Sequence, residues 1–103
     1  MSRYIIRTSP GGWSQPGRPA TKNVQMAIDM LKGDFQKTSK QFKLAKFEAR
    51  RYWDQEEYMG TQNYCVEADI GECEPQLVYI EYQQNYKGHV ALISFLRTWP
   101  WMK

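Results

Sequence analysis

The chain has 103 residues, a net charge of +3, and 42% hydrophobic and 15% aromatic residues. This content excludes global disorder and suffices for one core, so we expect a single α+β domain over residues 1–103. The apolar run in the opening MSRYIIRTSPGG is too short for a signal peptide, and the longest apolar run, VALISFL, has seven residues and is too short for a membrane span. We therefore expect no membrane partner and a cytoplasmic location, in a cell's own cytoplasm or that of an infected host.

Charge is divided unevenly along the chain. Residues 1–51 hold eleven Lys or Arg against three acids, whereas residues 52–103 hold three against eight. This asymmetry indicates either a basic binding surface or two halves that lie side by side within the fold. The second interpretation is the expectation. The first would let the basic half of one copy meet the acidic half of another.

The N-terminal third predicts a strand, a long loop and a helix. RYIIRT (3–8) is a short strand, and SPGGWSQPGRPA (9–20) is a Gly/Pro-rich loop without regular structure. Trp13 in this loop either docks on the core or contacts a partner.

The helix that follows is predicted over residues 21–33. Thr21 is its expected N-cap, and Gly33 occupies a C-cap position. Apolar residues recur at helical spacing between them, and Met26 and Met30 are expected to widen this face as core filler.

KQFKLAKFEARRYW, residues 40–53, combines positive charges with aromatic rings. Thr38 followed by Gln41 resembles a capping box, so we predict a second helix over 39–59. A strand over 41–49 is the alternative, but alternation of apolar and polar residues fails midway through it.

This predicted helix has an apolar face, which includes Phe42, Tyr52 and Trp53, and a basic flank. The residues that could neutralise phosphates are Lys40, Lys43, Lys46, Arg50 and Arg51. The apolar residues that fall nearly opposite the buried face are Leu44, Phe47 and Tyr58. Because the other aromatics would be buried rather than available to bases, this patch favours a protein partner over nucleic acid.

Three strands are predicted to follow, over 63–68, 76–82 and 89–96. A helix over 89–99 is the alternative for the last of them. The order becomes β-α-α-β-β-β, a mainly antiparallel sheet with two helices packed on one face.

No catalytic, metal or cofactor site is expected. His89 is the only histidine, and neither a nucleophile motif nor a zinc or calcium spacing is present. Cys65 and Cys73 are expected to be reduced, although a turn centred on Asp69 could bring them together.

We expect a small non-enzymatic binding or regulatory module that acts through a protein–protein interface, with a second copy as one candidate partner. The candidate partner contacts are Trp13, Leu44, Phe47, Tyr58, Trp99 and Trp101. Trp99 and Trp101 either close over the core or anchor a partner. The alternative is a nucleic-acid-binding protein that uses the basic helix 39–59, and the third hypothesis is a small enzyme with carboxylate, Tyr or His chemistry.

Overall fold

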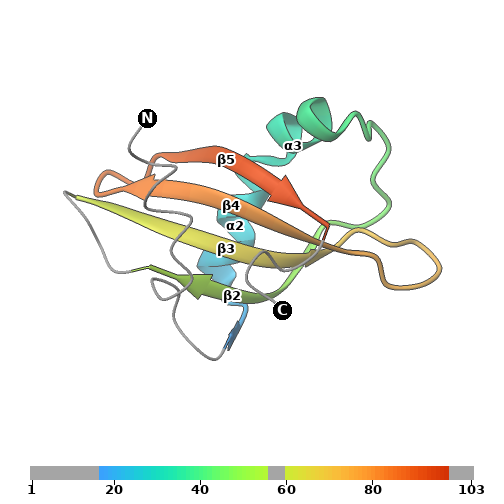
Figure 1. Cartoon of the computed structure of the whole chain (residues 1–103), viewed down its shortest axis with the longest axis horizontal. Helices are drawn as coiled ribbons and strands as arrows, with labels where there is room; N and C mark the ends of the chain where they lie inside the picture. Colours follow the sequence, from blue (N-terminus) through green and yellow to red (C-terminus); the bar gives the residue numbers. More distant parts are fainter. Residues whose placement is uncertain (1–16, 56–59, 98–103) are drawn as a thin grey trace.

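The computed structural model describes residues 17–55 and 60–97 of the chain. Its elements are β1 (Arg18–Pro19), α2 (Lys22–Met30), α3 (Lys32–Ser39), β2 (Glu48–Asp54), β3 (Thr61–Asp69), β4 (Leu77–Asn85) and β5 (Val90–Leu96). The strands form one antiparallel sheet in the order β1-β2-β3-β4-β5, with both helices on one face (Figure 1). The predicted α+β fold is confirmed. No helix in these two ranges is long and apolar enough to cross a membrane.

Helix α2 begins where the sequence indicates. The Thr21 side chain accepts a hydrogen bond from the Val24 N–H at 3.2 Å, which satisfies one free donor of the first turn. The C-cap prediction was wrong, because the chain turns at Leu31 directly into α3 and Gly33 lies inside that helix.

The predicted second helix over 39–59 was wrong. Helix α3 ends at Ser39, and Lys40 adopts a left-handed conformation with φ 61°. The chain then enters β2, which pairs with β1 on one side and β3 on the other. Hydrogen bonding to two strands therefore overrides the helical propensity of this lysine- and alanine-rich segment.

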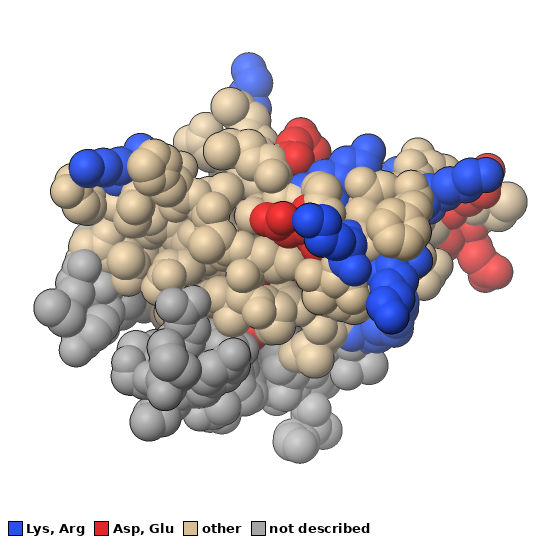
Figure 2. All heavy atoms as spheres, turned by 90° about the horizontal axis from the view of Figure 1, so that it is seen from above, with Lys and Arg blue, Asp and Glu red and all other residues tan. Residues whose placement is uncertain are grey.

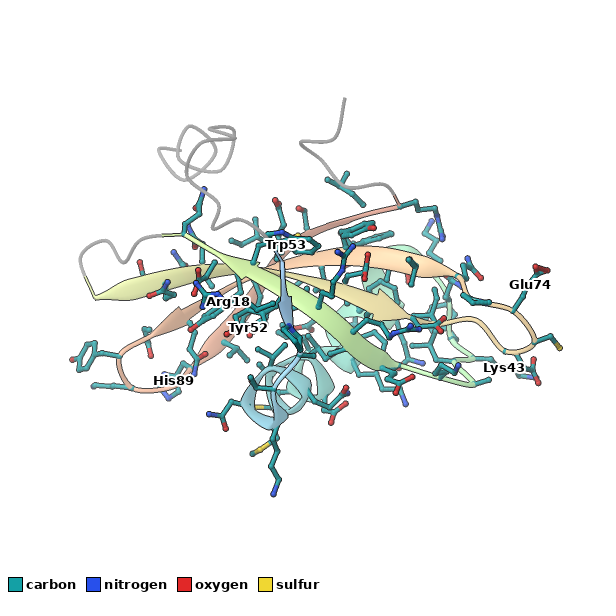
Figure 3. All side chains as sticks on the ribbon, turned by 90° about the horizontal axis from the view of Figure 1, so that it is seen from below. Arg18, Lys43, Tyr52, Trp53, Glu74 and His89 are labelled. Carbon is teal, nitrogen blue, oxygen red and sulfur yellow. The ribbon has the colours of Figure 1, made fainter. Side chains whose placement is uncertain are left out.

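A β-bulge in β2 explains why its alternation is hidden. The register with β3 shifts between Ala49 and Arg51, which leaves Arg50 as an extra residue. Tyr52 and Trp53 are consecutive residues of a strand, so Tyr52 faces the helices while Trp53 faces the other side of the sheet (Figure 3). The prediction that Tyr52 and Trp53 share one helix face was wrong for this reason.

The three C-terminal strands confirm the period-two pattern. β3 starts two residues earlier and ends one residue later than predicted, β4 starts one residue later and ends three later, and β5 starts one residue later. The turn before β5 is closed by the Asn85 side chain, which accepts from the N–H groups of Lys87 and His89 at 2.9 and 3.0 Å. Gly88 takes φ 87° there, a conformation that favours glycine.

The main core lies between the helices and the sheet. Its largest fully buried apolar side chains include Ile28, Leu31, Phe35, Ile80 and Tyr82. The other face of the sheet carries a smaller buried cluster of Trp53, Cys65 and Tyr79. Both cysteines are free thiols: Cys65 is buried, whereas Cys73 is exposed.

Several predictions fall on the N-terminal part of the chain. The strand over 3–8 and Trp13 lie outside the described residues. Within the predicted loop 9–20, Arg18 and Pro19 form β1, so the expectation that this loop lacks regular structure was wrong at its end. Proline at this position is compatible with an edge strand, because its missing N–H need not join the ladder.

Candidate functional site

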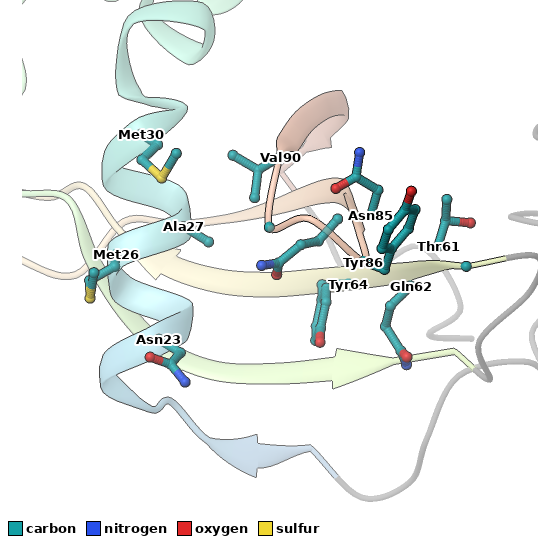
Figure 4. Close-up of a pocket in the computed structure, with 13 residues that line it drawn as sticks. Asn23, Met26, Ala27, Met30, Thr61, Gln62, Tyr64, Asn85, Tyr86 and Val90 are labelled. Atoms are coloured by element: carbon teal, nitrogen blue, oxygen red, sulfur yellow. The ribbon is translucent and has the colours of Figure 1, made fainter.

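A cavity of about 450 Å³ opens between α2 and the end of the sheet where β3 begins and β4 ends (Figure 4). Helix α2 contributes one wall through Asn23, Met26, Ala27 and Met30. The other wall comes from the sheet and its two turns: Gly60, Thr61, Gln62, Tyr64, Gln84, Asn85, Tyr86, Gly88 and Val90. Its volume lies within the usual range of about 300–1,000 Å³ for ligand sites.

Large apolar side chains surround this cavity without being buried in it. Met26, Met30 and Tyr86 are 55, 66 and 80% exposed. The expectation that the two methionines fill the core was therefore wrong. Their α2 neighbours Ala27 and Ile28 occupy the core side of the helix instead.

A second cavity of about 270 Å³ continues along α2 toward its N-terminus. It shares Asn23, Tyr64 and Gln84 with the larger cavity. The remaining lining residues are Thr21, Val24, Tyr52, Asp54 and Tyr82. We call the two cavities together the α2 groove.

Hydrogen-bonding groups in the α2 groove are mostly uncharged. Within the described residues, the side-chain amides of Asn23 and Gln84 form no hydrogen bond, which leaves both available to a ligand. Burial raises the pKa of Tyr64 and Tyr82, so both phenols stay neutral at physiological pH. Asp54 lies at the far end, where both its carboxylate oxygens are 3.4 Å from the Arg18 guanidinium.

The opposite face of the sheet holds a charged network. Arg51 donates two hydrogen bonds to Glu67, at 3.0 and 2.9 Å, and its guanidinium lies 5.1 Å from the Trp53 ring centre. The Tyr79 hydroxyl donates to the same carboxylate at 2.8 Å. This arrangement satisfies a buried carboxylate with three charge-assisted bonds, which is the requirement for a stable structural ion pair.

A second buried carboxylate anchors the β3–β4 hairpin. Asp69 accepts from the backbone N–H groups of Gly71 and Gln76, at 2.9 and 3.0 Å. Lys46 and Arg50 each lie 3.4 Å from its other oxygen. The basic β2 segment and the acidic β3 segment therefore lie side by side, which confirms the expected interpretation of the divided charge.

Both buried carboxylates have lowered pKa values. Burial raises the pKa of Glu67, but the hydrogen bonds from Arg51 and Tyr79 and the charge of Arg51 lower it by more. Backbone hydrogen bonds from Gly71 and Gln76 lower the pKa of Asp69. Each group therefore stabilises the fold fully above its unfolded pKa of about 4 and loses this contribution as the pH falls through its folded value.

We accordingly expect the free energy of unfolding to fall as the pH drops below about 4. Urea titrations followed by circular dichroism between pH 2 and 7 measure this. The variant Glu67→Gln should give a flatter profile below pH 4, whereas Glu72→Gln, at an exposed carboxylate, should reproduce the wild-type slope. Identical slopes for Glu67→Gln and wild type would contradict the assignment.

Of the predicted partner contacts, the structure places two. Leu44 and Phe47 are half-buried against the main core, and the Phe47 ring lies 5.4 Å from that of Phe35. Packing accounts for their apolar character, and their role in partner binding remains a prediction. The other predicted contacts lie outside the described residues: Trp13, Tyr58, Trp99 and Trp101.

The predicted basic residues separate into two groups. Three of them bind buried carboxylates of β3, namely Lys46, Arg50 and Arg51. Lys40 and Lys43 stay exposed on the loop between α3 and β2. Phe42, expected on a buried face, is 69% exposed between these two lysines in the sequence, because the segment is a loop rather than a helix.

No three His, Cys, Asp or Glu side chains converge as a metal site within the described ranges. Comparison with known proteins matches the chain to no family model, no curated protein and no solved structure. The assignment of function therefore depends on the chemistry of the surfaces.

Sequence reasoning missed the α2 groove, although one signal for its methionines was present. At about 100° per residue, Met26 and Met30 fall more than about 100° from the centre of the stripe formed by Val24, Ala27, Ile28 and Leu31. That position indicates exposure rather than burial. No local sequence signal predicts that Gln84 and Tyr86 lie beside α2, because the packing of the sheet against the helix places them there.

Proposed function

We propose that this protein is a small non-enzymatic binding module whose α2 groove holds a short, uncharged segment of a partner protein. One observation carries the proposal. Of the five large apolar side chains exposed among the described residues, Met26, Met30 and Tyr86 line the same cavity. Exposed apolar side chains gathered at one concave place, rather than scattered, mark an interaction site.

The chemistry of the lining favours a peptide as the ligand. Side-chain amides such as those of Asn23 and Gln84 offer one acceptor and paired donors, which match the carbonyl and N–H of a peptide group. Methionine side chains adapt to differently shaped apolar groups, a property used at peptide-binding surfaces. Met26 and Met30 would therefore accept an aliphatic or aromatic side chain of the partner.

Charge selects among partner segments. The described residues that line the larger cavity include no Lys, Arg, Asp or Glu. A charged group placed there would lose hydration without gaining a counter-ion, which is unfavourable. We therefore expect the bound segment to be uncharged over the residues that enter this cavity.

Selection from a random heptapeptide phage library on immobilised protein tests the proposal. Enriched peptides should bind wild type saturably in isothermal titration and lose at least about fivefold in affinity on Met30→Glu, since a truncated or charged hot-spot contact costs more than about 1 kcal/mol. The matched control is Phe42→Glu, which places the same charge at an equally exposed apolar site outside the groove.

Two results would overturn the proposal. One is enrichment of no peptide that binds saturably. The other is a set of peptides whose affinity falls on Phe42→Glu and not on Met30→Glu. Hydrogen exchange provides a second measurement, because bound peptide should protect α2 and the β4–β5 turn.

Self-association remains an alternative form of the same proposal. The divided charge gives it little support, because Arg51 binds Glu67, and Lys46 and Arg50 bind Asp69, within one chain. A groove-mediated dimer would instead show a mass above 12.2 kDa in light scattering that Met30→Glu returns to the monomer value.

We place the module in the cytoplasm; an exposed free thiol at Cys73 supports a reducing compartment.

A further inference from the structure

Four exposed lysines lie on α3 and the loop that follows it. These are Lys32, Lys37, Lys40 and Lys43. None of them forms an ion pair with a described residue. Figure 2 shows Lys and Arg side chains gathered toward one end of the molecule, together with Asp and Glu side chains, where this loop and the β3–β4 hairpin lie. These four ammonium groups are therefore outside the internal ion pairs, although the exposed carboxylates Glu72 and Glu74 of the hairpin lie at the same end (Figure 3).

An exposed aromatic ring lies within this basic segment. Phe42 is 69% exposed, and its backbone carbonyl accepts a hydrogen bond from the Gln36 side chain at 2.9 Å. The preceding residue is also held, because the Gln41 N–H donates to Ser39 and its side chain accepts from Arg97 at 3.2 Å. The Phe42 ring is therefore exposed to solvent, and hydrogen bonds hold the backbone of the loop that carries it.

A hollow of about 510 Å³ joins the ring to the lysines. It is lined by Lys32, Gln36, Phe42, Lys43, Leu44, Ala45 and Glu72. The two ammonium groups outnumber the one carboxylate, and the ring provides an apolar surface beside them. A ligand that is both anionic and flat matches this combination.

We propose that the α3–β2 loop binds single-stranded nucleic acid, with a base stacked on Phe42 and phosphates near Lys32, Lys40 and Lys43. Stacking on a side chain requires a base that is not already stacked within a duplex, which favours a single strand. An anionic membrane would satisfy the lysines but gives no flat group for the ring, and an acidic protein segment gives one only where it also carries an aromatic side chain. This surface is separate from the α2 groove, so either proposal can fail without the other.

Fluorescence anisotropy with a labelled 15-nucleotide oligo(dT), and its oligo(U) counterpart, tests the proposal at low salt. We expect saturable binding that weakens with added NaCl. Neutralising about three phosphates predicts a slope near −2 for the logarithm of the association constant against the logarithm of salt concentration. No saturable binding of either oligonucleotide would overturn the proposal.

Variants locate the binding surface. Phe42→Ala should weaken oligonucleotide binding by about 5- to 150-fold, the range for loss of one stacked base. The double variant Lys40→Gln, Lys43→Gln should weaken binding and reduce the magnitude of the salt slope by about 1.4. Glu72→Gln should tighten binding, because it removes the one carboxylate that lines the hollow.

The chain offers a matched control at its other end. Tyr86 is also exposed, and the ammonium of Lys87 lies 5.8 Å from its ring centre. Figure 3 places Lys43 and the β4–β5 turn at His89 at opposite ends of the molecule. Tyr86→Ala with Lys87→Gln should therefore leave oligonucleotide affinity unchanged, although it alters the α2 groove.

Competing ligands decide the chemical class. Heparin supplies negative charge without bases, and vesicles containing phosphatidylserine supply an anionic surface. If heparin or the vesicles bind as tightly as the oligonucleotides and Phe42→Ala changes none of the affinities, the assignment to nucleic acid is overturned. Loss on Phe42→Ala confined to the oligonucleotides supports it.

Discussion

Replacing Phe35 by alanine is expected to lower the free energy of unfolding by about 3–5 kcal/mol. Phe35 is 0% exposed, and its ring lies 5.4 Å from that of Phe47 and 5.1 Å from that of Phe95. It therefore connects α3, the loop before β2 and the edge strand β5. Removing the ring leaves a cavity among these three elements that none of them can fill.

Urea denaturation followed by circular dichroism measures this loss, which is large against the total of about 5–15 kcal/mol for a small domain. Phe42→Ala is the matched control, because it removes the same side chain from an exposed site and should change stability by less than about 0.5 kcal/mol. Equal effects of the two substitutions would contradict the described core. The same control shows that any loss of oligonucleotide binding on Phe42→Ala does not come from unfolding.

Gly71→Ala should destabilise the protein by about 1–3 kcal/mol or more, because no space exists for the added methyl group. A Cβ at this position would lie 1.9 Å from the carbonyl oxygen of Glu74 and 2.7 Å from the backbone nitrogen of Gln76. The hairpin would have to open, and Asp69 would lose its N–H donors. Thermal unfolding and urea titration measure the change.

Gly33→Ala gives the opposite sign and serves as the control. Apart from its chain neighbours and the backbone of its own helix, no atom lies within 4 Å of a Cβ at Gly33, which is in the first turn of α3. Alanine there should stabilise the protein by about 0.4–1 kcal/mol, because it reduces the conformational entropy of the unfolded chain at a position whose backbone alanine can adopt. A neutral Gly71→Ala variant would show that the β3–β4 hairpin is not packed as described.

Local signals predicted the elements whose patterns are complete within a few residues. The Thr21 cap and the apolar spacing after it identified α2, and alternation with turn residues identified β3, β4 and β5. Each of these signals arises from backbone geometry that acts over fewer than about ten residues. A single sequence therefore sufficed for them.

β2 was mistaken for a helix because its stability is not local. The bulge at Arg50 interrupts its alternation, and Lys and Ala favour a helix in isolation. What holds the strand is pairing with β3, together with the bonds from Arg51 to Glu67. These partners are 16 residues apart in the sequence, so no window around β2 contains them.

The candidate sites likewise depend partly on local sequence and partly on tertiary packing. The sequence by itself determined the α+β class, the order of most elements and the presence of a lysine-rich segment with aromatic residues. Only the tertiary structure decided that Lys46, Arg50 and Arg51 are used internally while Phe42 is exposed. It also brought Met30 of α2 and Tyr86 of the β4–β5 turn to one groove. The reason is physical: propensity and periodicity act between near neighbours, whereas exposure and ion pairing depend on which distant segments pack together.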